Sequence, residues 1–420
     1  MYTKTVLANG LRVITSAMPH SRSVCVAFLV GTGSCYESEE EAGISHFVEH
    51  LYFKGTKRRA TAKEISQDVE GLGGIINAST DKEVTIFWCK VPSAHFSVAV
   101  DVLSDLLLNS RLDSKDIEQE RQVVIEEINM EMDSPQRQAG ILIDKLLWPG
   151  QPLGRRITGD KEAVTSLSRG QILDYVARRY LPNNTVVSIA GNMKHEEAIA
   201  QIETLFDKWA GGELLPGYIT DDKQTAPRLG IKPKDSEQAH LCLAVHGLSL
   251  FHPDRFALGL LNAVLGGGMS SRLFTEIREK RGLAYDIHSY VDHFLNSGSV
   301  TVYAGVDPKK TETAVTAILE ELSKFKQGIA LGELNMAKEM SKGRLQLRLE
   351  DSQSVALWLG GQEILRRHIL GIDDVISIID AITLDDLRRV AGELLLSEEL
   401  NLAVVGPITR EEPLLERLKI

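Results

Sequence analysis

His46-Phe47-Val48-Glu49-His50 is the stretch of this 420-residue chain that says most about its fold and chemistry. Residues four apart lie on the same face of an α-helix, so His46 and His50 can both reach one metal ion. Glu49 follows His46 by three residues and stays near that face, where its carboxylate can hold a water on the metal. The pentad therefore predicts a metal-binding helix.

The alternative is that two surface or core histidines fall four apart by chance. Composition alone would produce such a pentad in roughly a few per cent of chains of this length. The metal-site interpretation is supported by the order His-x-x-Glu-His, which is the reverse of the His-Glu-x-x-His zinc-protease signature and is called the inverzincin order. The rest of the sequence must be used to choose between a metal site and a chance spacing of two histidines.

Length and composition indicate a globular protein of two to three domains. Hydrophobic residues make up 43% and charged residues 25% of the chain. No apolar run reaches eighteen residues, so we expect no membrane span. The net charge of -11 argues against a nucleic-acid binder. It is compatible with attraction of basic peptides, but an acidic balance is also common among soluble proteins.

The first residues predict a β-hairpin and not a targeting segment. Residues 1–7 and 11–14 have strand character and flank the turn dipeptide Asn9-Gly10. They contain neither the apolar core of a signal peptide nor an Arg-rich amphipathic helix, so we expect a cytoplasmic protein. The cysteines form no Cys-x-x-Cys pair and are expected to be reduced, mostly buried thiols; they are Cys25, Cys35, Cys89 and Cys242.

The two halves of the chain share a pattern. Residues 168–177 and 383–391 each begin with a helix-capping hydroxyl and continue as an amphipathic helix. Each is followed at a similar offset by a short apolar strand ending in glycine, at 185–191 and 401–406. This repetition predicts a duplicated domain.

The boundary between the halves is expected in the Gly-, Pro- and charge-rich segment 211–235. A buried strand at 239–245 follows it, and a helix at 254–265 is placed like the helix of the pentad. We predict an α+β fold of two homologous domains, 1–210 and 236–420, each a mainly antiparallel sheet with helices packed mainly on one face.

A catalytic zinc site usually needs a third protein ligand. A helix is predicted from about residue 113 to 133, with a buried stripe of Ile117, Val124 and Ile128. Its periodicity places Glu120 and Glu127 on one face. Spacing alone does not choose among the glutamates of this helix, which also form a typical solvated acidic face; they are Glu118, Glu120, Glu126, Glu127 and Glu131.

Longer segments resemble the pitrilysin/insulinase family of zinc peptidases, and in particular the mitochondrial processing peptidase beta subunit and its bacterial relatives. Residues 46–56 resemble the active-site helix of the family. Residues 73–80 resemble its Gly-Gly-x-x-Asn-Ala-x-Thr strand, and residues 120–127 its Glu-Arg-x-x-x-x-x-Glu helix. Further matches extend the resemblance over nearly the whole chain; they are 152–154, Gly159, 265–274 and 278–285.

The resemblance implies one zinc ion per chain, held by His46, His50 and Glu127. Glu120 matches the other acid of the helix motif and is expected to orient a ligand histidine. Glu49 is expected to be the catalytic base, which takes the proton of the zinc-bound water and later delivers it to the leaving amine.

The resemblance also implies substrate-binding residues. Asn77 and Ala78 are expected on an edge strand that pairs with the substrate backbone, although sequence alone favours a turn for Asn77. Arg278 and Tyr285 are expected to bind the substrate from the second half. That half contains no second His-x-x-Glu-His pentad and is expected to be catalytically silent.

The family architecture implies one half of a clamshell chamber, and a homodimer or a heterodimer with a homologous subunit. The function predicted is that of a zinc-dependent endopeptidase acting on peptides or unstructured segments. One alternative is a non-catalytic partner subunit, which the four intact residues at the pentad and Glu127 speak against. The other is a module that binds peptides without cleaving them.

Overall fold

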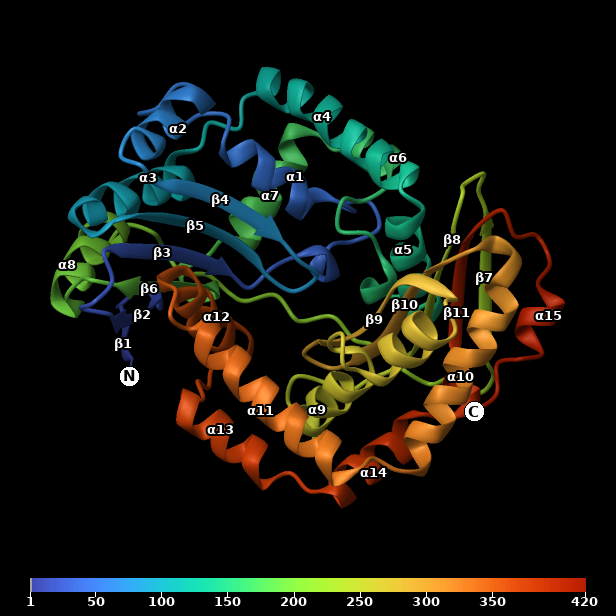
Figure 1. Ribbon diagram of the computed structural model, residues 1–420. Coiled ribbons are helices and arrows are strands. Elements are labelled where there is room, and N and C mark those ends of the chain that lie inside the picture. The colour runs from blue at the N-terminus through green and yellow to red at the C-terminus, as the bar shows by residue number, and fades with distance from the viewer. Residues whose placement is uncertain (1) are drawn as a thin grey trace. The chain divides into compact units, whose positions relative to one another are not determined.

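A computed structural model describes residues 2–420 (Figure 1). This part of the chain forms two compact units, and each is assembled from three segments. The first unit comprises residues 1–128, 156–218 and 346–371, and the second comprises 129–155, 219–345 and 372–420. Each unit is built around one sheet.

The sheet of the first unit has six strands in the order β1-β2-β6-β3-β5-β4. All neighbouring pairs are antiparallel except β2 and β6, which are parallel. The predicted hairpin is confirmed, because Val6 pairs with Arg12 across the Asn9-Gly10 turn. The strands are β1 (Thr3–Val6), β2 (Arg12–Ala17), β3 (Ser23–Val30), β4 (Ile75–Thr80), β5 (Thr85–Pro92) and β6 (Thr185–Gly191).

The sheet of the second unit has five strands in the order β7-β11-β8-β10-β9. Here only β7 and β11 are parallel. Apart from β1, the two sheets share one topology, with β2, β6, β3, β5 and β4 corresponding to β7, β11, β8, β10 and β9. The strands are β7 (Arg228–Pro233), β8 (Ala239–His246), β9 (Ala284–His293), β10 (Gly298–Val306) and β11 (Asn401–Gly406).

The repeated helix-strand pattern is also confirmed. Helix α7 (Arg169–Arg179) is capped by Ser168 and helix α14 (Leu384–Leu394) by Thr383, and both carry a reciprocal capping box. They precede β6 and β11, the corresponding strands of the two sheets. The predicted helix at 254–265 is α9 (Arg255–Gly266), between β8 and β9. The fold is thus an internally duplicated α+β architecture.

The two halves exchange one helix each, which the sequence did not indicate. Helix α5 (Pro135–Leu147) comes from the first half of the chain and packs on β8 and β11 of the second sheet. Helix α12 (Ser352–Arg366) comes from the second half and packs on β3 and β6 of the first sheet (Figure 1). The compact units are interleaved along the chain, so they do not test the predicted division into 1–210, a linker and 236–420. That division concerns the duplicated domains and stays a prediction.

Close packing and a buried ion cluster attach α12 to the first sheet. A side chain at Gly360 would bring its Cβ within 2.4 Å of Leu29 Cδ1 and 2.9 Å of Ser188 Cβ, so only glycine allows this approach. Glu363 on the same helix is 1% exposed. Its carboxylate lies 2.6 Å from Lys4 Nζ and 3.3 Å from the guanidinium of Arg12. These contacts satisfy charges that burial would otherwise penalise.

Other helices cover the opposite face of the first sheet. Phe28 of β3 packs on Phe206 of α8 with ring centroids 5.4 Å apart, while Leu29, its neighbour in the strand, faces α12.

The remaining helices of the described chain are α1 (Ile44–Tyr52), α2 (Ala62–Glu70), α3 (Phe96–Asn109), α4 (Ser114–Asp133), α6 (Lys161–Ser166), α8 (His195–Phe206), α10 (Thr311–Gln327), α11 (Leu331–Arg348), α13 (Ile372–Ala381) and α15 (Glu412–Leu415). The short turns are η1 (Ser34–Tyr36), η2 (Ser93–His95), η3 (Pro152–Gly154), η4 (Pro182–Asn184), η5 (Phe274–Lys280, π-helical), η6 (Pro308–Lys310) and η7 (Ser397–Glu399).

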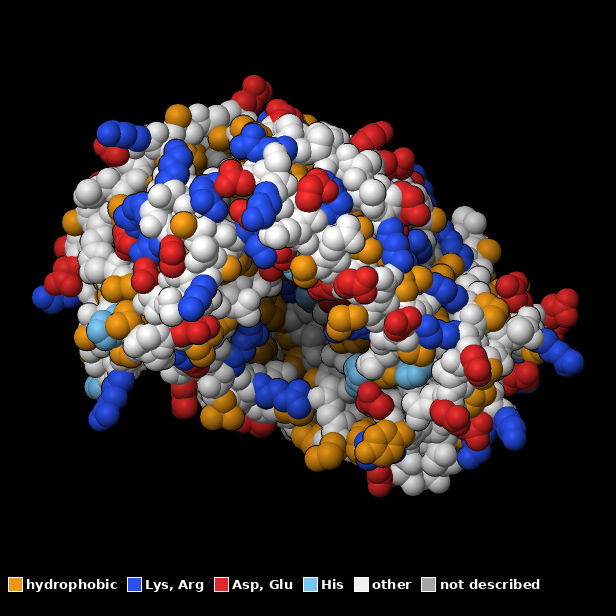
Figure 2. Space-filling view, turned by 90° about the horizontal axis from the view of Figure 1, so that it is seen from above, with side chains coloured by type: hydrophobic (Ala, Val, Ile, Leu, Met, Phe, Trp, Pro, Cys, Tyr) orange, Lys and Arg blue, Asp and Glu red, His pale blue; other side chains and the backbone are white. Residues whose placement is uncertain are grey.

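Two further predictions concern membrane spans and cysteines. Among residues 2–420, no helix is long and apolar enough to cross a membrane. Basic and acidic side chains are interspersed over the face of the molecule in Figure 2. All four cysteines are unpaired and buried, as expected.

Candidate active site

Helix α1 is positioned by its buried surroundings and by a carboxylate at its N-terminus. Apart from Glu49 and His50, its residues are all buried. Glu37, 5% exposed, accepts hydrogen bonds from the backbone N–H groups of Gly43 (2.7 Å) and Ser45 (2.8 Å). A carboxylate here satisfies orphan donors and complements the helix dipole. Gly43 has φ +91°, and a Cβ there would lie 2.6 Å from the carbonyl oxygen of Thr158.

Helix α4 supplies the acidic side of the site and matches the predicted helix within one residue. Its buried positions include the stripe Ile117, Val124 and Ile128. Arg121 donates to the backbone carbonyls of Val164 and Leu167, and its guanidinium lies 5.6 Å from the ring centroid of Phe47 on α1. These contacts fix the rotation of α4 so that Glu120 and Glu127 face the histidines.

The structure brings His46, His50 and Glu127 together as the three-residue group able to hold a metal ion among residues 2–420. The two Nε2 atoms are 3.2 Å apart. Glu127 Oε2 lies 3.5 Å from Nε2 of His46 and 3.4 Å from Nε2 of His50. Three donor atoms from two helices therefore converge on one point.

The spacing and chemistry of these donors fit zinc. Tetrahedral zinc with bonds of about 2.0–2.1 Å places its ligand atoms about 3.3–3.4 Å apart. The three observed separations, 3.2, 3.4 and 3.5 Å, lie around this value. Two imidazoles and one carboxylate also form the ligand set of known catalytic zinc sites, which leave the fourth position to water.

Glu120 orients one of the two imidazoles. Its Oε1 lies 2.9 Å from Nδ1 of His50, and its Oε2 lies 2.6 Å from Nζ of Lys54. A carboxylate on Nδ1 holds the ring so that Nε2 points at the ligand position. Nδ1 of His46, by contrast, is buried and has no hydrogen-bond partner within residues 2–420. The packing around α1 must set the orientation of that ring.

The two imidazoles titrate differently without a metal. Burial, together with the charge of His50, lowers the pKa of His46 to about 4. Burial also acts to lower the pKa of His50. Hydrogen bonds to Glu120 and Glu127 have a larger effect in the opposite direction and raise this pKa to about 9. With facing nitrogens 3.2 Å apart, the two imidazoles titrate as a coupled pair, in which the carboxylates favour the charged form of His50.

Glu49 lies beside this cluster and does not belong to it. Its Oε2 accepts a hydrogen bond of 2.5 Å from the hydroxyl of Thr80, the last residue of β4. Burial raises the pKa of Glu49, although the Thr80 hydrogen bond acts in the opposite direction. A carboxylate with a raised pKa suits proton transfer near neutral pH.

Asn77 and Ala78 lie on β4, and β4 is an edge strand of the first sheet. The sequence alone favoured a turn at Asn77, and that interpretation is wrong. Both residues pair with β5 in the ladder, Asn77 with Trp88 and Ala78 with Phe87, and the N–H of Ala78 donates to Oδ1 of Asn77 over 2.8 Å. The outer edge of β4 thus presents backbone groups that another strand can bind.

Arg278 and Tyr285 belong to the second unit and lie close together there. The guanidinium of Arg278 lies 5.0 Å from the ring centroid of Tyr285 and 4.7 Å from that of Phe274. Tyr285 is 76% exposed. Their predicted contact with substrate stays a prediction.

Two residues of the site received no role from the sequence. Lys54 and Thr80 both lie within the segments that resemble the family motifs, but neither is a ligand or base by residue type. Lys54 follows His50 by four residues and so continues the face that carries both histidines. That spacing was a usable signal, whereas the contact of Thr80 with Glu49 depends on how β4 passes α1.

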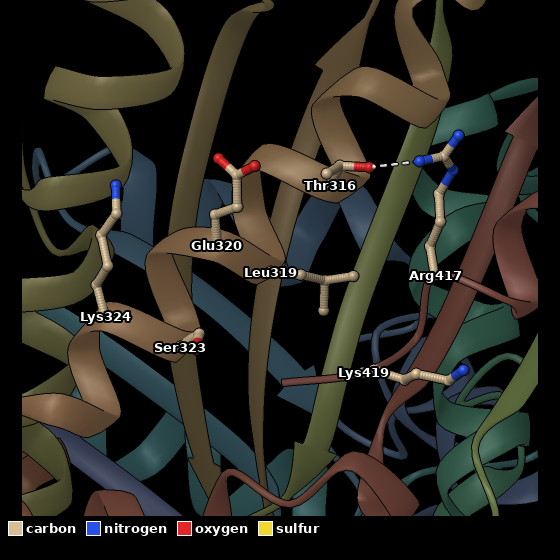
Figure 3. Close-up of a pocket in the computed structure, with 7 residues that line it drawn as sticks. All are labelled: Thr316, Leu319, Glu320, Ser323, Lys324, Arg417 and Lys419. Atoms are coloured by element: carbon tan, nitrogen blue, oxygen red, sulfur yellow. Dashed lines mark hydrogen bonds between the residues drawn. The ribbon is translucent and has the colours of Figure 1, made fainter.

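A hollow of about 360 Å³ in the second unit offers different chemistry (Figure 3). Arg417 donates to the hydroxyl of Thr316 there over 3.1 Å. The lining contains one carboxylate and no histidine; it consists of Thr316, Leu319, Glu320, Ser323, Lys324, Arg417 and Lys419. This hollow is therefore not a candidate metal centre.

Comparisons with known proteins agree with this geometry. The family model described as insulinase (peptidase family M16) matches residues 12–161, and the peptidase M16 inactive domain matches residues 166–341. The duplicated scaffold and the donor cluster define the class as metallopeptidase-like. More particularly, the chain belongs to the insulinase family of peptidases.

The chain is similar to bacterial proteins over nearly its whole length. An uncharacterized zinc protease of Mycobacterium leprae is 37% identical over 425 residues, which cover 99% of this chain and 94% of that protein. An uncharacterized zinc protease of Bacillus subtilis is 35% identical, with 97% and 98% covered. The solved structure of a protease from Helicobacter pylori has the same fold, with a TM-score of 0.93 at 24% identity and 97% and 99% of the two chains covered.

Proposed function

We propose that this protein is a zinc-dependent endopeptidase that cleaves peptides or unstructured segments. The observation that carries the proposal is the convergence of His46, His50 and Glu127 beside a separately held Glu49. The names of its relatives, zinc proteases, support the same function.

The proposed mechanism assigns different tasks to the residues. His46, His50 and Glu127 would hold the zinc ion, with Glu120 fixing the ring of His50 through Nδ1. Bound zinc supplies Lewis acidity, which acidifies a coordinated water and polarises a carbonyl. Glu49 removes the proton of the attacking water and then transfers it to the nitrogen of the leaving amine. The hydroxyl of Thr80 holds one oxygen of Glu49 throughout, which keeps the carboxylate aimed.

The proposed substrate site is the open edge of β4. An extended peptide that adds to this edge makes backbone hydrogen bonds beside Asn77 and Ala78. The same strand ends at Thr80, which contacts Glu49 over 2.5 Å, so a peptide on β4 lies next to the catalytic base. Backbone recognition favours unfolded segments over folded proteins. We propose that Arg278 and Tyr285 add contacts to the substrate.

A metal-exchange experiment tests this function. The purified protein is stripped with a chelator, and hydrolysis of a fluorogenic peptide, of an unfolded protein and of the same protein in its folded state is measured before and after one equivalent of zinc is restored. We expect activity to vanish on stripping and to return with zinc, with folded proteins left uncut. Tight zinc binding without hydrolysis of any peptide in a broad library would instead favour a non-catalytic subunit or a peptide-binding module.

A further inference from the structure

Lys54 contacts a residue of the proposed zinc site but has no role in the mechanism above. Its ammonium lies 2.6 Å from Oε2 of Glu120, while the other oxygen of Glu120 lies 2.9 Å from Nδ1 of His50. One oxygen of Glu120 thus contacts the imidazole, and the other forms an ion pair with Lys54. Lys54 thus reaches the ligand histidine through Glu120.

The backbone holds Lys54 in place for this contact. Helix α1 ends at Tyr52 in a tight closing turn, in which the N–H groups of Phe53 and Lys54 donate to the carbonyls of His50 and Leu51, over 3.2 and 3.1 Å. Two residues further on, the hydroxyl of Thr56 donates over 2.6 Å to Asp105, a carboxylate 1% exposed. Lys54 therefore projects from a fixed backbone directly after the C-terminal end of α1.

Glu120 needs such a partner because it is buried. Only 6% of its surface is exposed, and a buried carboxylate is stable as an anion only when it is paired. Lys54 supplies this partner, because its ammonium forms an ion pair with Glu120. A fixed, anionic Glu120 in turn orients the ring of His50 through Nδ1.

We propose that Lys54 is a positioning residue of the zinc site, which strengthens metal binding by holding the Glu120 carboxylate against Nδ1 of His50. This inference rests on the proposed zinc-binding function. It assigns Lys54 no contact with the substrate and no proton-transfer step.

A double-mutant cycle on zinc affinity tests the inference. Zinc dissociation constants are measured by chelator competition at one pH for the wild type, Lys54→Met, Glu120→Gln and the double variant. Partners of ligand histidines typically contribute about 10- to 100-fold in metal affinity. We expect Glu120→Gln to fall in that range, Lys54→Met to lose about tenfold, and the double variant to bind as weakly as Glu120→Gln alone.

Lys57 provides a matched control in the same loop. It is exposed, and Lys57→Met removes the same charge three residues away, so its zinc affinity should equal that of the wild type. Circular dichroism of each zinc-free variant checks that the fold is intact, and affinities are referred to the folded fraction.

The possible outcomes separate this inference from the proposed function. A wild type that binds no zinc contradicts the proposed function itself. A wild type that binds tightly, with Lys54→Met equally tight, overturns only the role of Lys54. Losses that multiply in the double variant also overturn it, because Lys54 would then act independently of Glu120.

Discussion

Glu127→Gln is the substitution that most directly probes the choice of the third metal ligand. Glu127 Oε2 lies 3.4 and 3.5 Å from the two histidine nitrogens, whereas its neighbour Glu126 is exposed on α4. The substitution keeps the size of the side chain and removes its charge. Glu126→Gln makes the same chemical change one residue away and serves as the matched control.

The expected loss follows from the number of ligands. Structural zinc sites with four protein ligands bind with roughly 10–16 kcal/mol, so one ligand contributes on average about 3 kcal/mol. That is equivalent to about 100-fold in the zinc dissociation constant. The amide oxygen of glutamine can still coordinate weakly, so we expect a loss of up to about 100-fold for Glu127→Gln and less than about twofold for Glu126→Gln.

Chelator-competition titrations of both variants measure these affinities, with circular dichroism to show that α4 stays folded. If Glu127→Gln binds zinc as tightly as the wild type, Glu127 is not a ligand. Equal losses in the two variants would mean that the general charge of the acidic helix matters, and not a ligand at one position. Either result would refute the reasoning from the donor geometry.

Three further predictions follow from the described contacts. The pKa of His50 is about 9 and that of His46 about 4, so zinc must displace a proton from His50. Zinc affinity should therefore rise about tenfold per pH unit from pH 6 to 8. Zinc dissociation constants that do not change over this range would contradict this prediction. Thr80→Val should lower kcat roughly 10- to 100-fold with KM and zinc content unchanged, while Thr80→Ser retains activity; steady-state kinetics would disprove it if KM alone changed. Glu363→Leu should destabilise the protein by about 3–5 kcal/mol, because it leaves the buried Arg12 unpaired; an unchanged urea midpoint would count against that ion cluster.

Periodicity predicted several helices and strands, because its signals are local. The helix expected at 113–133 is α4, and the strands expected at 185–191 and 401–406 are β6 and β11. The exchange of α5 and α12 could not be predicted in this way. An amphipathic helix shows which face it buries but not which sheet covers that face, and the glycine that allows the approach of α12, Gly360, touches residues far away in sequence.

The residues of the site likewise fall into those that local sequence patterns predicted and those whose contacts join distant elements. His46 and His50 follow from helical spacing, and Glu120 and Glu127 were placed on one face by periodicity. The selection of Glu127 over four other glutamates required the family resemblance. The contacts of Lys54 with Glu120 and of Thr80 with Glu49 join separate elements, so only the three-dimensional structure brought them out.

In the proposed mechanism, Glu49 performs proton transfer beside a zinc ion that it does not bind. Zinc content and peptide hydrolysis of Glu49→Gln, measured on the same preparation, test it most directly. We expect one zinc per chain, as in the wild type, and a kcat lower by roughly 10²–10⁴-fold. A zinc-loaded Glu49→Gln protein with undiminished hydrolysis would contradict it.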